Sequence, residues 1–200
     1  TDADVEGDVL DAIWRRVIDR TFNCVSVDTD TSTSDTAIVL ASGAAGAVNL
    51  AELEAALEHV TQSLTKQVAR DGEGAETLIE VTVDNARDAE QAKTVAKSIV
   101  NSPLVKTAVH GADPNWGRVA MAVGKCNDTN INQDHVVIRF GAQEVYPHPV
   151  SESGLAQLSE YMKGSDVLIH VSLNNGSSTA TVWGCDLTDG YVRINADYTT

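Results

Sequence analysis

The sequence places one acidic side chain where it could meet a ligand. Glu73 lies between Gly72 and Gly74, directly after a predicted long helix. Glycine lets a ligand approach the backbone closely, and a carboxylate forms charge-assisted hydrogen bonds with an amine. Two interpretations stay open at this point: Glu73 binds a cationic group, or it is a solvated carboxylate at the end of a helix.

A second candidate is the stretch 110–118, which reads His-Gly-Ala-Asp-Pro-Asn-Trp-Gly-Arg. His110 opens it and is the histidine of most interest for function. Asn115 can cap the short helix that we expect to continue through residue 123. The alternative is a rigid turn in which Asp113 pairs with Arg118.

Residues 28–36 alternate acidic and hydroxyl side chains, as a calcium-binding loop does. An EF-hand loop that starts at Asp28 needs Gly at its sixth position and Glu at its twelfth, but the sequence has Thr33 and Val39 there. The tract is therefore either a set of β-turns and helix caps or an active-site loop lined with hydroxyl groups.

The sequence lacks the motifs of several common sites. Its histidines do not occur at the spacings typical of zinc sites, so we predict no metal site. It contains no serine nucleophile elbow, no phosphate-binding P-loop and no dinucleotide fingerprint. Cys24, Cys126 and Cys185 are widely spaced, and we expect them to be reduced and to fill space.

Composition excludes further classes of protein. The chain has 14 Lys and Arg against 29 Asp and Glu, a formal net charge of −15, so nucleic acid and anionic membranes are unfavourable partners. No apolar run reaches the roughly 18 residues of a membrane span, and no signal peptide is evident, so we expect a cytosolic protein. Because no Met precedes Thr1, we expect the chain to be a piece of a longer polypeptide.

Hydrophobic periodicity predicts alternating helices and strands. Asn and Gly between two apolar runs near residue 175 favour a hairpin there. A soft boundary divides the chain into regions 1–125 and 126–200. We predict helices over 8–22, 50–70, 88–100 and 154–163, strands over 37–41, 77–83 and 104–109, hairpins over 136–140 with 144–146 and over 166–173 with 179–183, and a polar tail over 186–200.

Seven of these stretches together resemble the ornithine acetyltransferase family, also called the bifunctional arginine-biosynthesis acetyltransferases. They occur in the family's order over nearly the whole chain, which makes the likeness specific. The matching stretches are 1–3, 20–23, 28–36 with 41–43, 71–75, 110–118, 183–187 and 191–200.

The resemblance implies that this is the C-terminal (β) chain of a precursor that cuts itself before a threonine. That threonine becomes the nucleophile, and its amine can serve as base. In the family the Thr-Asp-Ala string lies a few residues downstream of the nucleophile, so we expect the nucleophile to lie upstream of this chain and to be absent from it. The alternative is that Thr1 itself is the nucleophile.

The implied reaction is ping-pong transfer of an acetyl group from N2-acetyl-L-ornithine to L-glutamate through an acetyl-threonine. The resemblance assigns substrate contacts to Glu73, Asn195 and Thr200. It also implies an α/β fold, namely an αββα sandwich of the ornithine acetyltransferase and DmpA-like type, which a separate α chain completes. It implies that the oxyanion hole lies on that α chain. It further implies a heterotetramer of two α and two β chains or a larger assembly. The implied substrates are small amino acids, no cofactor is implied, and acetyl-CoA is a candidate co-substrate.

Two rival hypotheses differ in chemistry. A self-cleaving β-aminopeptidase-like amidohydrolase would share the general fold but pass its acyl group to water. A structural or interaction subunit would use its acidity only for solubility.

Overall fold

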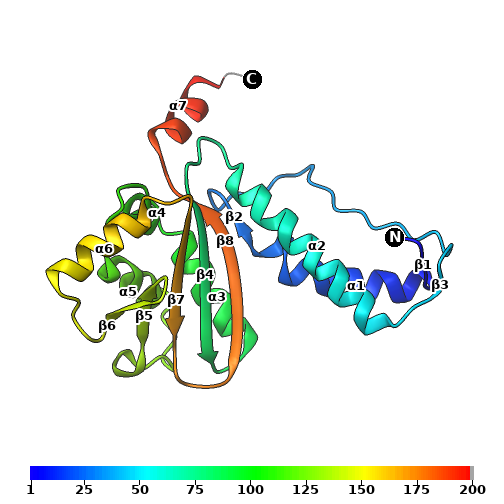
Figure 1. The fold of residues 1–200 in the computed structure, drawn as a ribbon, viewed down its shortest axis with the longest axis horizontal. Helices are drawn as coiled ribbons and strands as arrows, with labels where there is room; N and C mark the ends of the chain where they lie inside the picture. Colours follow the sequence, from blue (N-terminus) through cyan, green and yellow to red (C-terminus); the bar gives the residue numbers. More distant parts are fainter. Residues whose placement is uncertain (199–200) are drawn as a thin grey trace.

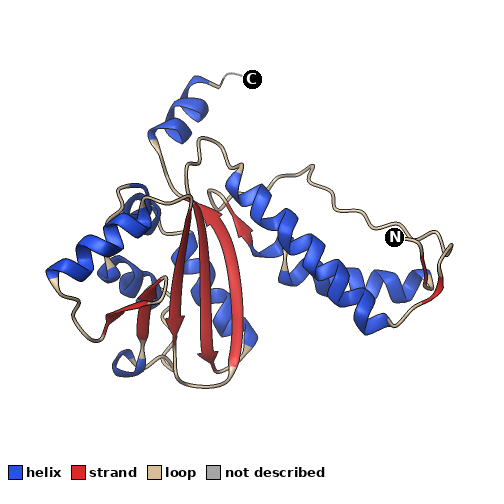
Figure 2. Cartoon of the chain, viewed as in Figure 1, coloured by secondary structure: helices blue, strands red, loops and turns tan. Residues whose placement is uncertain are grey.

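The computed structural model describes residues 1–198 and centres on a six-stranded mixed sheet (Figures 1 and 2). The strand order is β2-β8-β4-β7-β5-β6. In the middle, β4 runs parallel to β7 and antiparallel to β8. Strand β2 runs parallel to β8, and β5 runs antiparallel to both β6 and β7. The strands are β2 (Val25–Ser26), β4 (Leu78–Ala86), β5 (Val137–Phe140), β6 (Gln143–Tyr146), β7 (Asp166–Ser172) and β8 (Ser178–Cys185).

One face of this sheet forms the core. Alternate residues of β4, namely Ile79, Val81 and Val83, are fully buried, as expected for side chains on one face of a strand. Helix α3 (Ala89–Val100) covers this face, where Val100 lies over Gly184 of β8. The further helices of this part are α4 (Pro103–His110), α5 (Trp116–Gly124) and α6 (Glu152–Met162), with a short 3-10 helix, η2 (Gln133–His135).

Two long helices form an arm that projects from the sheet (Figure 1). They are α1 (Gly7–Arg20) and α2 (Leu50–Arg70), which pack side by side. Arg16 and Arg20 of α1 each form an ion pair with Glu54 of α2. At the far end of the arm, β1 (Ala3–Asp4) and β3 (Gly46–Ala47) form a two-stranded parallel sheet, and η1 (Phe22–Cys24) links α1 to β2. No helix in the described part of the chain is long and apolar enough to cross a membrane.

The predicted α/β class is confirmed, and the five predicted helices, including the short one through residue 123, occur close to their expected positions. The β5–β6 hairpin is confirmed as well. The sheet contains β2 and β4 from the predicted first region and four strands from the second, so a division near residue 125 does not separate two sheets. The second sheet layer of an αββα sandwich depends on another chain and stays a prediction.

Four local predictions were wrong. Residues 104–109 form helix α4 because Ser102 caps its N-terminus and Pro103 occupies the first turn, signals that outweigh the β-branched residues. Residues 37–41 form no strand, and Ile38 and Leu40 are 72% and 76% exposed. The expected second hairpin is split because β4 lies between β7 and β8. The polar tail contains a helix, α7 (Asp189–Asp197), capped by Thr188.

Candidate functional site

The turn that carries Glu73 lies against helix α7. Strand β4 begins at Leu78, which pairs with Cys185 at the end of β8, so the turn before β4 and the helix after β8 meet at one edge of the sheet. The Asn195 amide donates a hydrogen bond of 2.7 Å to the Glu73 carboxylate. The fold thus joins two candidate residues that lie 122 positions apart.

Gly74 allows this close approach. Its φ angle of +66° is in the left-handed region, and a Cβ at this position would lie 2.3 Å from the backbone nitrogen of Tyr191. The Thr188 hydroxyl donates a hydrogen bond of 2.6 Å to the Gly74 carbonyl and accepts one from the Tyr191 amide. One threonine therefore caps α7 and binds the turn.

Helix α7 also contacts the acidic tract after β2. The Tyr191 hydroxyl donates a hydrogen bond of 3.1 Å to Asp28. Burial, and then this hydrogen bond, raises the pKa of Tyr191, which keeps the phenol protonated and able to donate. Neither Glu73 nor Asp28 takes part in an ion pair with any residue of the described range 1–198. Two carboxylates without a cationic partner from this part of the chain make this edge suitable for a cationic ligand.

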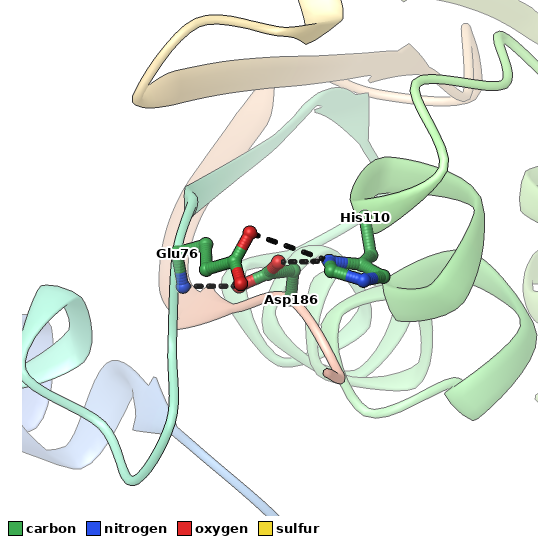
Figure 3. Close-up of side chains that lie close together, drawn as sticks. All are labelled: Glu76, His110 and Asp186. Carbon is green, nitrogen blue, oxygen red and sulfur yellow. Dashed lines mark hydrogen bonds and ion pairs between the residues drawn. The ribbon is translucent and has the colours of Figure 1, made fainter. Parts of the chain in front are cut away.

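Beside the turn, Glu76, His110 and Asp186 point toward one another (Figure 3). The Asp186 side chain is fully buried, and one of its oxygens lies 3.0 Å from His110 Nδ1. Its other oxygen accepts hydrogen bonds of 2.9 Å from the backbone amides of Glu76 and Thr77. The Glu76 carboxylate lies 3.9 Å from His110 Nδ1 and is mostly exposed. These three side chains are near enough to share a cation, but the hydrogen bonds among the protein groups already account for the arrangement.

A buried lysine lies under this edge. Lys106 is 3% exposed, and its ammonium donates a hydrogen bond of 2.6 Å to the Cys185 carbonyl. Burial lowers the pKa of Lys106, while the negative charges of Asp186 and Asp28 act in the opposite direction. Lys106 is thus a basic group of this chain beneath the candidate site. The signal available in the sequence was a lysine inside a largely apolar stretch, which we predicted to be a strand.

Comparison with known proteins identifies the family, because the model of the ArgJ family matches residues 1–200. The chain belongs to the ArgJ family. The arginine biosynthesis bifunctional protein ArgJ 2 of Nostoc sp. is 59% identical over 201 residues, which are 100% of this chain and 52% of that relative. The glutamate N-acetyltransferase Oat2 of Streptomyces clavuligerus is 55% identical over 206 residues, with the same coverage. The chain thus spans about half the length of these curated relatives.

The fold agrees with this membership of the ArgJ family. A crystal structure of the arginine biosynthesis bifunctional protein ArgJ from Bacillus halodurans matches with a TM-score of 0.93 and 41% identity. The match covers 98% of this chain and 96% of that chain. The resemblance inferred from short motifs is therefore confirmed at the level of the family and of the fold.

The structure brings together some of the candidate residues of this ArgJ chain. Glu73 and Asn195 are in contact, while Thr200 lies outside the described residues. The Thr1 ammonium donates to the Leu40 carbonyl, and β1 pairs with β3 just before the start of α2, whereas Glu73 follows the end of that helix. Because 21 helical residues rise about 30 Å, the geometry gives no support to Thr1 as a nucleophile acting beside Glu73.

The residues of the stretch 110–118 have two different structural roles. Its first residue, His110, joins the network of Asp186, whereas Asn115 caps α5 as predicted. The alternative, a pairing of Asp113 with Arg118, is wrong, because Arg118 donates instead to the Leu104 carbonyl and the Thr107 hydroxyl. Trp116 and Tyr146 stack at 4.9 Å beside a cavity of about 490 Å³.

Proposed function

We propose that this chain is the C-terminal half of an acetyltransferase that moves an acetyl group from N2-acetyl-L-ornithine to L-glutamate, as in arginine biosynthesis. The contact between Glu73 and Asn195 carries the proposal. This contact brings a carboxylate and an amide of a chain of the ArgJ family together, which supports a binding site for an amino acid. The names of two relatives, arginine biosynthesis bifunctional protein and glutamate N-acetyltransferase, support the same reaction.

In the proposed mechanism, a threonine that precedes this chain attacks the acetyl carbonyl carbon of N-acetylornithine. The amide C–N bond breaks, the hydroxyl proton passes to the departing amine, and an acetyl-threonine ester remains. The amine of glutamate then attacks this ester, and the threonine hydroxyl is restored. The exchange needs no cofactor, and acetyl-CoA, a thioester, is a candidate donor to the same threonine.

Charge assigns the contacts of the two substrates. The carboxylates of Glu73 and Asp28 favour the ammonium group of ornithine, and the amide of Asn195, together with Thr200, is suited to a substrate carboxylate. Asn195 must then turn from Glu73 toward the ligand. The buried ammonium of Lys106 reduces the repulsion that an anionic glutamate meets at this acidic edge.

We further propose that the other half of the precursor, freed by self-cleavage, is the partner of this chain. The relatives are about twice as long, and the arm exposes apolar side chains that a partner would cover. Val60, Leu64 and Val68 follow one another at four-residue spacing on α2 and are each about half exposed, so they form a stripe along the helix. The proposed enzyme is an αββα sandwich, contains two copies of each chain or more, and works in the cytosol.

The test is an assay of the enzyme expressed from its whole coding sequence, with N-acetylornithine in the presence and absence of glutamate. We expect N-acetylglutamate to form with glutamate and little acetate to form without it. An amidohydrolase would instead release acetate at the same rate under both conditions.

Glu73→Gln should raise the KM for N-acetylornithine about tenfold, because it removes one charged hydrogen-bond partner. The matched control, Glu160→Gln on the exposed surface of α6, should leave KM unchanged. An equal effect of both variants would contradict the role of Glu73 and leave a structural subunit as the better description.

A further inference from the structure

We propose that Asp186 is a positioning residue, which fixes the Glu73 turn against helix α7 and is itself held by His110. The inference rests on the proposed function, since it assigns Asp186 to the placing of the two residues that bind substrate. Asp186 does not contact Glu73 or Asn195 in the described structure; it acts on the backbone segments that carry them.

The carboxylate of Asp186 is the junction of these segments. It is fully buried and accepts hydrogen bonds from two consecutive amides, those of Glu76 and Thr77. The Asp186 amide donates in return to the Thr77 carbonyl, at 3.0 Å. The chain just before β4 is therefore bonded on both sides to the residue that follows β8.

Both substrate-binding residues lie a short way along the chain from this junction. Glu73 precedes the first bonded amide by three residues, and Asn195 is in the last turns of α7, which begins at Asp189. Thr188 supplies a second anchor through its bond to the Gly74 carbonyl. With two anchors the turn has a fixed orientation relative to the helix, whereas one anchor alone would let it rotate.

His110 completes the junction from a third element. It is the last residue of α4, and its Nδ1 lies 3.0 Å from the Asp186 oxygen that faces away from the two amides. With Nδ1 protonated, the imidazole donates to Asp186 and holds the plane of the carboxylate. A buried carboxylate needs such partners, because its ionised form is costly without them.

An Asp–His pair within the sheet provides a control that lies away from the Glu73 turn. Asp84 of β4 lies 3.0 Å from His170 of β7, at partly buried positions away from the Glu73 turn. Replacing Asp84 with Ala removes a carboxylate that lies at the same distance, 3.0 Å, from a histidine nitrogen. An effect on substrate that appears only when Asp186 is replaced is therefore not a general effect of breaking an Asp–His pair.

The experiment measures steady-state kinetics of the enzyme expressed from its whole coding sequence. We expect Asp186→Ala to raise the KM for N-acetylornithine about tenfold, with kcat less affected, because the turn loses two bonds to a charged acceptor. Asp186→Asn should recover most of the loss, since an amide oxygen can still accept from both backbone groups. Asp84→Ala should leave KM within about twofold. Equal KM values for Asp186→Ala and the unchanged enzyme would overturn the inference.

Hydrogen exchange of the Glu76 and Thr77 amides tests the junction without reference to activity. These amides should exchange about tenfold faster in Asp186→Ala than in Asp84→Ala.

If Asp186→Ala does not assemble, His110→Ala serves instead. It keeps both amides bonded, and we expect about a threefold rise in KM from the loss of one hydrogen bond. An unchanged KM in that variant would refute the proposal. If the unchanged enzyme transfers no acetyl group, the proposed function fails, and with it the role in substrate binding, while faster exchange would still show the structural junction.

Discussion

Gly74→Ala should separate the Glu73 turn from α7 without removing any charge. Two features of Gly74 predict a loss of stability. Its φ angle is +66°, and a Cβ would lie 2.3 Å from the Tyr191 nitrogen, more than 1 Å inside the 3.4 Å at which ordinary van der Waals contact begins. Backbone is on both sides of this contact, so no side chain can turn aside to relieve it.

The expected loss is the sum of three contributions. A left-handed conformation costs an alanine about 1 to 2 kcal/mol relative to glycine. Moving the backbones apart breaks the bond from Thr188 to the Gly74 carbonyl, worth about 1 kcal/mol. The same movement disturbs the N-cap of α7, worth about another 1 kcal/mol. Gly74→Ala should therefore reduce the free energy of unfolding by about 3 to 4 kcal/mol.

Gly46→Ala is the matched control, because Gly46 has a similar φ angle of +77° but no atom within 4 Å of the position that a Cβ would occupy. It should lose only the conformational part, about 1 to 2 kcal/mol. Denaturant unfolding of both variants measures the difference, and the KM for N-acetylornithine should rise in Gly74→Ala alone. Equal losses of stability in the two variants would refute the reasoning, because they would show that the turn and α7 are not in contact.

Two further predictions concern the arm. Leu64→Asp should reduce co-purification of this chain with the other half of the precursor, because it places a charge in the exposed apolar stripe of α2. Gln62→Asp, at an exposed polar position of the same helix, should leave co-purification unchanged. Equal recovery of the partner with both variants would contradict the proposed interface. Hydrogen bonds from Arg16, and then from Arg20, lower the pKa of Glu54 from 4.5 to about 2, so its stabilising effect is complete above pH 4.5 and is lost as the pH falls toward 2. Denaturant titrations should therefore show a difference in the free energy of unfolding between the unchanged protein and Glu54→Gln at pH 7, and this difference should shrink as the pH falls from 4.5 toward 2. A difference that does not depend on pH would show that the ion pairs do not form.

The helices were predictable because their signals are local. Apolar residues at three- and four-residue spacing specify α2 and α3, and Asn49 and Asp88 cap them within a few residues of the predicted starts. The strand predicted over 104–109 failed for the same kind of reason. Val105 and Val109 favour a strand, but the cap at Ser102 and the following proline decide in favour of a helix.

Strand pairing was not predictable from local pattern. The Asn-Asn-Gly segment near residue 175 fits a hairpin turn, yet in the structure Asn175 and Gly176 both donate to the Asn85 carbonyl at the end of β4. The loop passes around that end, so β7 and β8 lie on opposite sides of β4. Periodicity tells which face of a strand is buried, but it does not tell which strand is its neighbour.

The same limit explains what the sequence revealed of the candidate site. Glu73 and Asn195 were found through resemblance, because nothing in their local sequences distinguishes a ligand contact from a solvated helix end. Asp186 lay within a stretch that matched the family, but no role could be given to it. Its role depends on the antiparallel pairing of β4 with β8, which places the start of one strand beside the end of the other. With a β7–β8 hairpin, the segment after β8 would have no reason to meet the turn before β4. The pairing error and the missed junction therefore have a single cause, and the residue that records the true pairing most directly is the buried carboxylate that bonds Glu76 and Thr77.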